Sequence, residues 1–178
     1  MKYSLLLAFV LCTSTSIQVY AQQQATVTNS LKNYAFLIGE WEGEGGGQPG
    51  LGKGSFSFKP ELDGRIIVRK NRAEFAATAQ RPAFVHDDML IIYADQPGNP
   101  TKAILMDNED HTIHYDVTFS EDKRSVIFTS SITEGMPVFR LTYVQVDANT
   151  VNIKFEMAQP GKPDTFNLYL EGKAHRKK

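Results

Sequence analysis

The sequence has little cysteine, little tryptophan and no excess of charge of either sign. Its 178 residues include one cysteine, Cys12, and one tryptophan, Trp41, and 19 Lys and Arg side chains stand against 20 Asp and Glu side chains. A single cysteine excludes a disulfide framework within the chain and any zinc or iron–sulfur site built from several thiolates. No basic block is longer than the terminal stretch Lys173 to Lys178. We therefore expect no nucleic-acid partner, because the sequence offers little electrostatic attraction for phosphates.

The cysteine lies in an apolar run at the start of the chain. Lys2 precedes the run from Leu5 to Cys12, and Val19-Tyr20-Ala21 stands before a glutamine-rich stretch. A positive start, a short apolar stretch and a small residue before the cleavage point are typical of a secretory signal peptide. The run is too short to span a bilayer, so we expect no transmembrane segment. Lipidation of Cys12 is the weaker alternative, because the bulky Leu11 stands where a small residue would precede a lipidated cysteine.

These features predict the division of the chain. Residues 1–21 are expected to be a cleaved signal peptide, residues 22–29 a flexible leader and residues 30–178 a single domain. Cleavage after Ala21 would remove the cysteine, so the exported part would have no thiolate nucleophile. A chain of about 150 residues buries about 70% of its unfolded surface, which is enough for one self-sufficient domain. We expect the protein to be exported and either periplasmic or secreted.

One short helix is expected to precede a long series of strands. The segment Asn29 to Leu37 begins with a capping residue and carries Leu31, Tyr34 and Leu37 at helical spacing. Beyond it, apolar residues recur with the period of two that indicates strands. Such runs include Phe56-Phe58, Ile66-Val68, Met89-Ile91-Tyr93, Ala103-Leu105, Ile113-Tyr115-Val117-Phe119, Val126-Phe128, Phe139-Leu141-Tyr143, Val151-Ile153-Phe155-Met157 and Phe166-Leu168-Leu170.

The strand pattern predicts the fold class. About ten short strands separated by tight turns are typical of a sandwich or a barrel. In most strands one face is apolar and the other charged, as where Lys154 and Glu156 alternate with Ile153 and Phe155. A closed barrel with its apolar face inward satisfies this pattern and leaves no open edge. We expect an all-β fold, a closed up-and-down antiparallel barrel of about ten strands with one short N-terminal helix.

The first strand carries an unusual glycine pattern. Eight of the 13 glycines lie between Gly39 and Gly54. The motif Gly39-x-Trp41-x-Gly43-x-Gly45 places the indole and three glycines on one face of a strand, with Glu40, Glu42 and Glu44 on the other. Missing side chains on the inner face let a strand bend and let an indole or a ligand lie against the backbone.

This motif after a short helix resembles the opening of nitrobindin and related heme-binding β-barrels, which belong to the wider lipocalin and fatty-acid-binding (calycin) group. Further stretches resemble a family of small exported bacterial proteins of the same type: His86 to Tyr93, Asp107 to Tyr115, Phe139 to Tyr143 and Tyr169 to Lys173. The resemblance covers about residues 31–176. It implies a ten-stranded closed barrel that holds a small hydrophobic molecule. It also implies a cation–π contact that covers Trp41 with a basic residue of the last strand, Arg176 or Lys173.

The resemblance brings in heme as an alternative ligand. In nitrobindin a histidine near the C-terminus, on an inward strand, holds the heme iron. When residues 155–158 are matched to the family, the position of this histidine falls near Asn167. Alternation alone places Phe166 and Leu168 inward and Asn167 outward. No histidine occurs from Met157 to Ala174. Asparagine does not replace imidazole as an iron ligand, so we expect no cofactor and keep heme as the alternative.

His114 and His175 are the weak candidates for a metal or heme ligand. His111 and His114 lie three apart, beside the acids Asp107, Glu109 and Asp110. Residues three apart point to opposite sides of a strand. The acids fall in a turn, where Asp and Asn are favoured for backbone reasons alone. We therefore expect a solvated hairpin turn there, with a metal site as the alternative. His175 lies close to the end of the chain.

The predicted ligand-binding residues are Trp41, Tyr93, Tyr115, Arg140 and Tyr143. The tyrosines would present a polar tip to the lumen, although inward tyrosines are also ordinary core residues. Arg140 has apolar neighbours on both sides. Facing inward, its guanidinium would pair with a ligand carboxylate; facing outward, it would lie over apolar neighbours on the surface.

The sequence favours a binding protein over an enzyme. There is no Gly-x-Ser-x-Gly elbow, so Ser/His/Asp catalysis has no support. A carboxylate pair for glycoside hydrolysis stays open, because it depends on a tertiary distance. We expect an exported barrel that holds an apolar or amphipathic ligand such as a lipid or fatty acid. The alternatives are a heme-binding barrel and a filled barrel that acts as a structural or interaction module through residues 80–86 or 46–52.

Overall fold

The computed structural model describes residues 29–44, 53–95 and 101–178. The expected signal peptide, almost all of the expected leader and the loop 46–52 lie outside the described residues. The described elements are the 3-10 helix η1 (Asn29–Leu37) and the strands β1 (Gly39–Gly43), β2 (Lys53–Glu61), β3 (Ile66–Phe75), β4 (Phe84–Ala94), β5 (Thr101–Asp107), β6 (Thr112–Phe119), β7 (Ser125–Ser130), β8 (Val138–Gln145), β9 (Thr150–Ala158) and β10 (Phe166–Arg176). No helix among these residues has the length and apolar character needed to cross a membrane.

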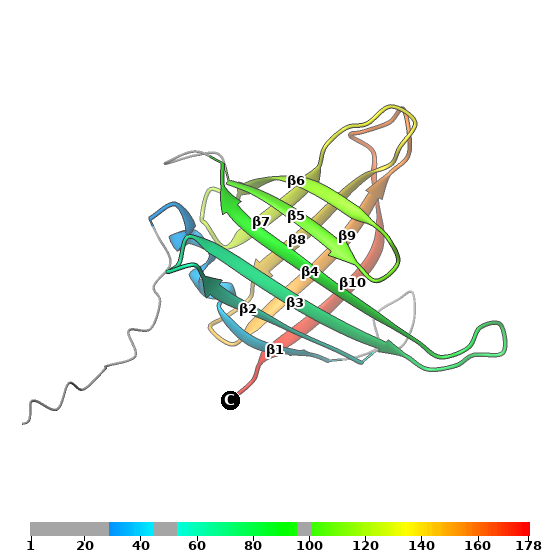
Figure 1. Ribbon diagram of the computed structural model, residues 1–178, viewed down its shortest axis with the longest axis horizontal. Helices are drawn as coiled ribbons and strands as arrows, with labels where there is room; N and C mark the ends of the chain where they lie inside the picture. The colour runs from blue at the N-terminus through cyan, green and yellow to red at the C-terminus, as the bar shows by residue number, and fades with distance from the viewer. Residues whose placement is uncertain (1–28, 45–52, 96–100) are drawn as a thin grey trace, which may run out of the picture.

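The strands form a closed antiparallel barrel, as the sequence predicts (Figure 1). Each strand pairs with the next along the chain, and β1 closes the sheet by pairing with β10. The joint brings Trp41 opposite Arg176 and Gly43 opposite Ala174. β1 is short, so this joint pairs residues 41–43 with residues 174–176 of β10.

Helix η1 packs into one end of the barrel (Figure 1). Leu31, Tyr34 and Leu37 are spaced three apart, which fits a 3-10 helix with its three residues per turn better than an α-helix. All three side chains are completely buried. The ring of Tyr34 meets Phe119 of β6 edge-on, with centroids 4.9 Å apart. The predicted short helix is confirmed, and its apolar face seals this end of the lumen.

Trp41 is held in place at the helix end by two kinds of contact. Its Nε1 donates a hydrogen bond of 2.8 Å to the carbonyl of Leu37, and the indole is fully buried. The guanidinium of Arg176 lies 4.3 Å from the centre of the indole and also donates to the carbonyls of Ile38 and Phe36. The expected cation–π contact is therefore made by Arg176.

The glycine that opens β1 makes room for this arginine. Gly39 has a φ of +132°, and a Cβ atom there would lie 2.5 Å from Nη1 of Arg176. The predicted alternation of β1 is confirmed as well, because Trp41 is buried while Glu40 and Glu42 are exposed. The absence of a side chain at Gly39 therefore allows Arg176 to approach the backbone at the closed end of the barrel. It does not serve to bend the strand at the open end.

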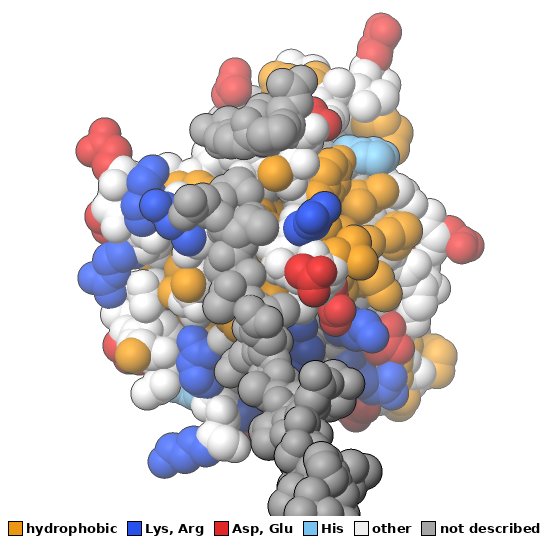
Figure 2. Space-filling view, turned by 60° about the vertical axis from the view of Figure 1, so that its left-hand side comes forward, with side chains coloured by type: hydrophobic (Ala, Val, Ile, Leu, Met, Phe, Trp, Pro, Cys, Tyr) orange, Lys and Arg blue, Asp and Glu red, His pale blue; other side chains and the backbone are white. Residues whose placement is uncertain are grey.

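Strands β3–β5 are apolar on both faces, and here alternation alone selects the wrong face as the core. Ile67, Leu90 and Ile92 point inward and are fully buried. Ile66, Val68, Met89, Ile91 and Tyr93, the residues that alternation picks out, lie on the outer face. Val68, Ile91 and Ile104 are neighbours across that face. Figure 2 shows hydrophobic side chains gathered on the outer surface, with a cationic side chain among them.

Candidate ligand-binding site

Aromatic side chains fill the half of the lumen next to η1. The ring of Tyr143 meets Phe58, Phe56 and Phe128 edge-on, with centroids 5.4, 5.8 and 6.3 Å apart. Phe56 in turn stacks on Trp41 at 6.0 Å. Edge-to-face contacts at these distances are favourable and leave little free space. This half is core, and a guest molecule has no room in it.

In the other half of the lumen, one inward side chain from each of strands β2 to β5 belongs to a row of register partners: Phe56, Asn71, Asp88 and Asp107. A hollow of about 700 Å³ follows this row on the outer face of the sheet. Outward side chains on either side of the row line it, among them Arg72 and Met89, whereas the side chains of Asp88 and Asp107 are buried. The hollow is therefore a groove on the outer surface and not part of the lumen.

Apolar side chains form the facing wall, on β8–β10. Phe139 stacks on Phe155 with centroids 5.7 Å apart. Leu141, Phe155 and Leu170 share one row across the three strands. Phe139, Phe155 and Leu170 face the lumen but stay partly exposed, because nothing in the described residues fills the space in front of them. The lumen thus has a polar wall and an apolar wall on opposite sides.

A buried ion pair marks the boundary between the filled half and the open half of the lumen. Nη2 of Arg69 donates to both carboxylate oxygens of Asp88, at 2.5 and 2.7 Å. Nη1 of Arg69 donates to the hydroxyl of Tyr143 at 2.7 Å, across the lumen from β3 to β8. Asn71 donates to the same carboxylate at 2.8 Å. A side-chain network of this kind is stable in a low-dielectric interior because its members are paired.

Burial acts on each member of this network. Burial is the largest effect on Arg69 and disfavours its charge, but Asp88 together with Tyr143 and Tyr115 outweighs burial and raises the pKa of the guanidinium. For Asp88 burial acts in the opposite sense, and the charge of Arg69 together with the hydrogen bonds from His86 and Asn71 lowers the pKa of the carboxyl. Burial raises the pKa of Tyr143 to about 12, so its hydroxyl stays neutral. The pair is therefore ionised at neutral pH.

His86 extends the network toward the open end. Its Nε2 lies 3.3 Å from Asp88 and its Nδ1 lies 2.8 Å from Glu109. The hydrogen bond to Asp88 is the main cause that raises the pKa of His86 to about 9; partial burial opposes it and Glu109 adds to it. His86 is therefore protonated at neutral pH, and neither ring nitrogen has a lone pair free for a metal.

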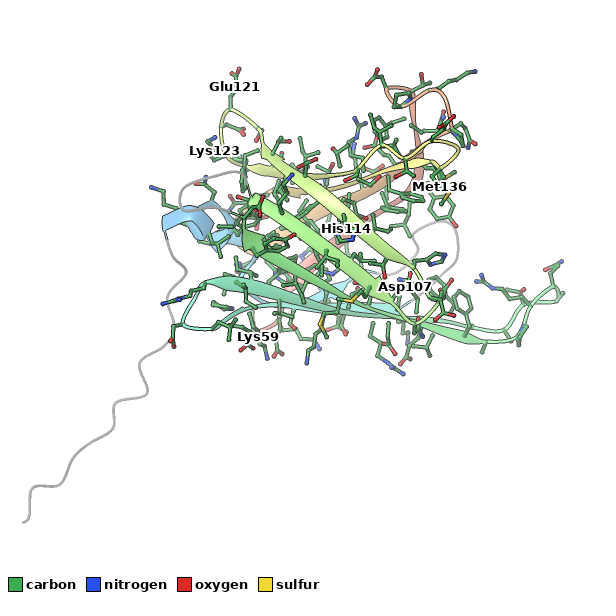
Figure 3. The ribbon with its side chains drawn as sticks, turned by 45° about the horizontal axis from the view of Figure 1, so that its top comes forward. Lys59, Asp107, His114, Glu121, Lys123 and Met136 are labelled. Carbon is green, nitrogen blue, oxygen red and sulfur yellow. The ribbon has the colours of Figure 1, made fainter. Side chains whose placement is uncertain are left out.

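Asp107 organises the turn between β5 and β6 at the open rim. Its Oδ1 accepts the backbone N–H groups of Glu109 and His111, both at 2.9 Å, and its Oδ2 lies 2.8 Å from Nδ1 of His111. Burial would raise the pKa of Asp107, but these hydrogen bonds outweigh it and lower the pKa. Figure 3 shows Asp107 at the end of the barrel away from Glu121 and Lys123. The expected hairpin turn is confirmed.

The structure places some of the predicted ligand-binding residues inside the barrel and others on its outer face. Tyr115 and Tyr143 lie inside the barrel, and Trp41 lies inside at the closed end; all three are buried. Tyr93 pairs with Ile66 and Lys102 on the outer face, so its placement in the lumen is wrong. The outer face of β4 is as apolar as the inner one, which is why alternation fails there.

Arg140 takes the outward alternative. Its Nε and Nη2 donate to the two carboxylate oxygens of Glu156, both at 2.8 Å, and its guanidinium lies 3.9 Å from the centre of the Phe166 ring. Arg140 and Glu156 are register partners on the face opposite Leu141 and Tyr143. Arg140 is thus a paired surface cation that does not reach the lumen.

The two weak metal candidates both lie outside the lumen. His114 lies on the outer face of β6, opposite Ile104 (Figure 3). His175 is exposed and contacts Glu44 at 2.5 Å and Thr150 at 3.3 Å. Within residues 29–44, 53–95 and 101–178, no three His, Cys, Asp or Glu side chains are placed to hold a metal ion together.

The register of β10 decides where Asn167 lies. Asn167 pairs with Met157, which pairs with Phe139, so it belongs to the lumen side. A register shift between Leu168 and Leu170 then reverses the alternation. The expectation that Phe166 and Leu168 face inward is therefore wrong. The position matched to the heme ligand is on the lumen side but carries an amide, and the nearby His86 is fully engaged, so the described residues do not fit heme iron.

Sequence reasoning missed the residues of the polar wall: Arg69, Asn71, His86, Asp88 and Asp107. Charged residues were expected on the solvent side of the strands. A signal was available, because Arg69 is in phase with Ile67 and Asp88 is in phase with Leu90 and Ile92. Opposite charges at inward phase on adjacent strands of a hairpin predict a buried pair.

Comparison with known proteins supports the fold. The model is similar to the crystal structure of Rv2717c from M. tuberculosis, with a TM-score of 0.62, 15% sequence identity and an alignment that covers 86% of this chain and 100% of that chain. At this identity the likeness shows a shared barrel fold and nothing finer. No protein-family model matches the sequence, and neither does any curated protein.

Proposed function

We propose that this protein is an exported binding protein that holds an apolar or amphipathic small molecule in the open half of its barrel. The observation that carries the proposal is the apolar wall of Phe139, Phe155 and Leu170, which face the lumen and stay partly exposed above an aromatic core. A barrel serving only as a structural module would have its lumen filled from end to end, as the half beside η1 is.

The two walls support an amphipathic guest. Phe139 and Phe155 present stacked rings to the lumen, and apolar burial supplies most of the affinity in such pockets. Asn71 lies on the lumen side of β3 and is partly exposed, so its amide can orient one polar end. No paired nucleophile and base accompanies Asn71 among the described residues, and the proposal is therefore one of binding and not of catalysis.

Binding can be measured with a neutral fluorescent probe, N-phenyl-1-naphthylamine, on the protein without residues 1–21. Leu170→Trp would place a larger side chain in the lumen, whereas Leu168→Trp makes the same change on the outer side of β10. We expect the probe to bind the unaltered protein and the Leu168→Trp variant alike. Leu170→Trp should weaken binding about tenfold, because it occupies part of the open half of the lumen.

Two controls keep this test decisive. Circular dichroism shows whether both tryptophan variants keep the barrel, and native mass spectrometry of gently purified protein reports any molecule that it carries. Absence of both probe binding and a co-purified molecule in the unaltered protein would remove the proposed function. Export is tested separately, by following the full chain and a form without residues 1–21 in cell fractions.

A further inference from the structure

The groove on the outer face of β2–β5 lies between two rows of outward side chains. Lys70, Met89 and Met106 are register partners and form one row, and Arg72 and Asp87 form the next. The two methionines are 37% and 38% exposed, so the first row offers apolar surface beside a cation. The groove is about 700 Å³ in volume and open to solvent. Small-molecule sites enclose most of their ligand, so an open groove of this kind suits a protein surface better.

An arm built from two of the same strands projects beyond the groove. Figure 1 shows the ends of β3 and β4, with the turn between them, extending past the rest of the barrel. We call residues 73–86 the β3–β4 arm. On its lumen side Phe75 stacks on Phe84 with centroids 4.4 Å apart, and the guanidinium of Arg81 lies 4.1 Å from the centre of the Phe84 ring. These contacts order the arm from one side.

The other side of the arm faces solvent. Glu74 and Val85 are register partners there, and they are the next outward pair after Arg72 and Asp87. The side chain of Glu74 is 58% exposed, and Val85 is partly exposed. A two-stranded ribbon by itself is only marginally stable in water. A surface that covers Glu74 and Val85 would therefore stabilise the arm.

The charges on the outer side of β3 have opposite signs on either side of Arg72. Lys70 stands two residues before Arg72 and Glu74 two residues after it, so both lie on the same face at equal distances from it. Arg72 is paired with Glu74 and with Asp87, both at 3.0 Å. Lys70 forms no ion pair within the part of the chain that the structure describes. The face thus carries a cation in the groove and a carboxylate on the arm.

The neighbouring strand β4 repeats this arrangement with apolar side chains. Val85 stands two residues before Asp87 and Met89 two residues after it, and all three point outward. Val85 belongs to the arm and Met89 to the groove. The arm therefore presents a carboxylate and an apolar side chain in the same order in which the groove presents a cation and a thioether.

We infer that two copies of this chain associate through this face, about a two-fold axis that runs across β3 and β4 over Arg72 and Asp87. The axis places the arm of each protomer in the groove of its partner. Glu74 of one protomer meets Lys70 of its partner, and Val85 meets Met89 in the same way. Arg72 and Asp87 neutralise each other within each protomer, so the two pairs can approach at the axis.

The pattern favours a second copy over an unrelated protein, because the groove and the surface that complements it belong to the same chain. A two-fold interface is self-complementary, and each contact in it occurs twice. A stable interface buries about 800 Å² on each partner. Each protomer contributes both its arm and its groove to that area. The inference does not depend on the proposed function, which concerns the lumen.

Sedimentation velocity of protein purified after expression of the full chain tests this inference. A concentration series from about 1 to 100 µM should show a species of twice the protomer mass and give its Kd. Lys70→Glu brings two carboxylates together at two places in the interface, and we expect the Kd of the dimer to rise at least about tenfold. Glu74→Lys should have the same effect, because it brings two cations together.

The exchange of both charges separates this pairing from a general effect of charge. Lys70→Glu combined with Glu74→Lys restores opposite charges across the axis, and it should return the Kd to within about threefold of the unaltered protein. Lys154→Glu is the matched control, because Lys154 is exposed on β9 and pairs with Glu171 of the same chain. This variant should leave the Kd unchanged.

Val85→Arg gives a second, independent variant. It puts a charge against Met89 of the partner, and it should also raise the Kd at least about tenfold. Circular dichroism shows whether each variant keeps the barrel, and Val85→Arg decides the question should the charge variants fail to fold.

Three results would overturn the inference. One is a single species of protomer mass at every concentration of the unaltered protein. Another is a dimer whose Kd is the same in Lys70→Glu, Glu74→Lys and Val85→Arg, which would place the interface on a different face. The third is a double variant that dissociates as readily as the two single charge variants, since Glu74 and Lys70 would then not meet across the axis.

Discussion

Arg69 donates from a single nitrogen, Nη2, to both oxygens of Asp88, and the two side chains are 6% and 3% exposed. Neither residue is near the other in sequence, and the antiparallel pairing of β3 with β4 brings them together. Asn71, His86 and Tyr143 complete the hydrogen bonds around the pair. The pair therefore places a satisfied polar layer in the lumen, above the aromatic core, in place of an apolar one.

Removing one partner of this pair should cost more stability than removing both. Asp88→Leu leaves a buried guanidinium without its counter-charge, and we expect a loss of about 3–5 kcal/mol in the free energy of unfolding. The double change Arg69→Leu with Asp88→Leu replaces the pair with apolar side chains and should lose clearly less. Urea unfolding followed by circular dichroism measures both. An equal loss in the single and double variants would contradict this account.

A control for this comparison lies next to Asp88 on the outer face. Asp87 contacts Arg72 at 3.0 Å, and both side chains are about half exposed. Asp87→Leu makes the same chemical change one residue away, and it should alter the free energy of unfolding little, because exposed ion pairs contribute little. A loss in Asp87→Leu as large as in Asp88→Leu would show that burial is not the cause.

His86 should make the stability of the protein fall as the pH rises above neutrality. Its pKa is raised from 6.5 to about 9 in the folded protein, because protonated His86 is hydrogen-bonded to Asp88 and Glu109. A raised pKa gives a stabilisation that is fully present below about pH 6.5, and this stabilisation is lost as the pH rises through about 9. Unfolding midpoints in urea between pH 6 and pH 10 follow this decline.

Comparison of two histidine variants isolates this contribution. In His86→Gln the decline between pH 6.5 and 9 should be reduced, because the variant has no proton to lose there. His114→Gln should keep the full decline, since His114 lies on the outer face and contacts neither carboxylate. A variant His86→Gln with an unchanged pH profile would assign the decline to other groups.

The closed end should be sensitive to a single methyl group at Gly39. Gly39→Ala adds a Cβ that would meet Nη1 of Arg176 at 2.5 Å, at a φ of +132°. Strain of this kind costs about 1–3 kcal/mol in the free energy of unfolding. Gly172→Ala is the control, because a Cβ there would have no neighbour within 4 Å. The fluorescence of Trp41, the chain's one tryptophan, should also shift in Gly39→Ala if Arg176 moves off the indole.

The sequence alone predicts the barrel and its closed end, because the residues that decide both lie close together along the chain. In β1 one face carries three glutamates at alternate positions, so the direction of Trp41 follows from period two alone. Leu31, Tyr34 and Leu37 repeat every third residue, which brings them onto one side of a 3-10 helix. Both patterns have one polar and one apolar side, so only one orientation buries the apolar side in the core.

The polar wall of the lumen cannot be predicted in this way, because it breaks the rule that places charges in solvent. Arg69 follows three apolar residues and precedes Lys70, so its charge looks like the start of an exposed stretch. Its burial depends on Asp88, which lies 19 positions away. The register shift at Leu168 and Leu170 is likewise invisible to a period of two, because it inserts one residue into that period.

The same register shift leads to a prediction about heme. The resemblance to nitrobindin places the iron-binding histidine at a position matched by Asn167, and this residue pairs with Met157 on the lumen side. The unaltered protein mixed with hemin should therefore show no shifted Soret band. Asn167→His restores an imidazole at that position, on the lumen side, and should produce one.

Leu168→His is the matched control, because Leu168 is 58% exposed and points away from the lumen. It adds the same imidazole one residue along β10, and it should leave the hemin spectrum unshifted. A shifted band in the unaltered protein would mean that another side chain binds the iron, and His86→Gln would test the one lumen histidine on the polar wall. A band in Leu168→His equal to that in Asn167→His would mean that hemin binds on the outer surface, and that the lumen does not select it.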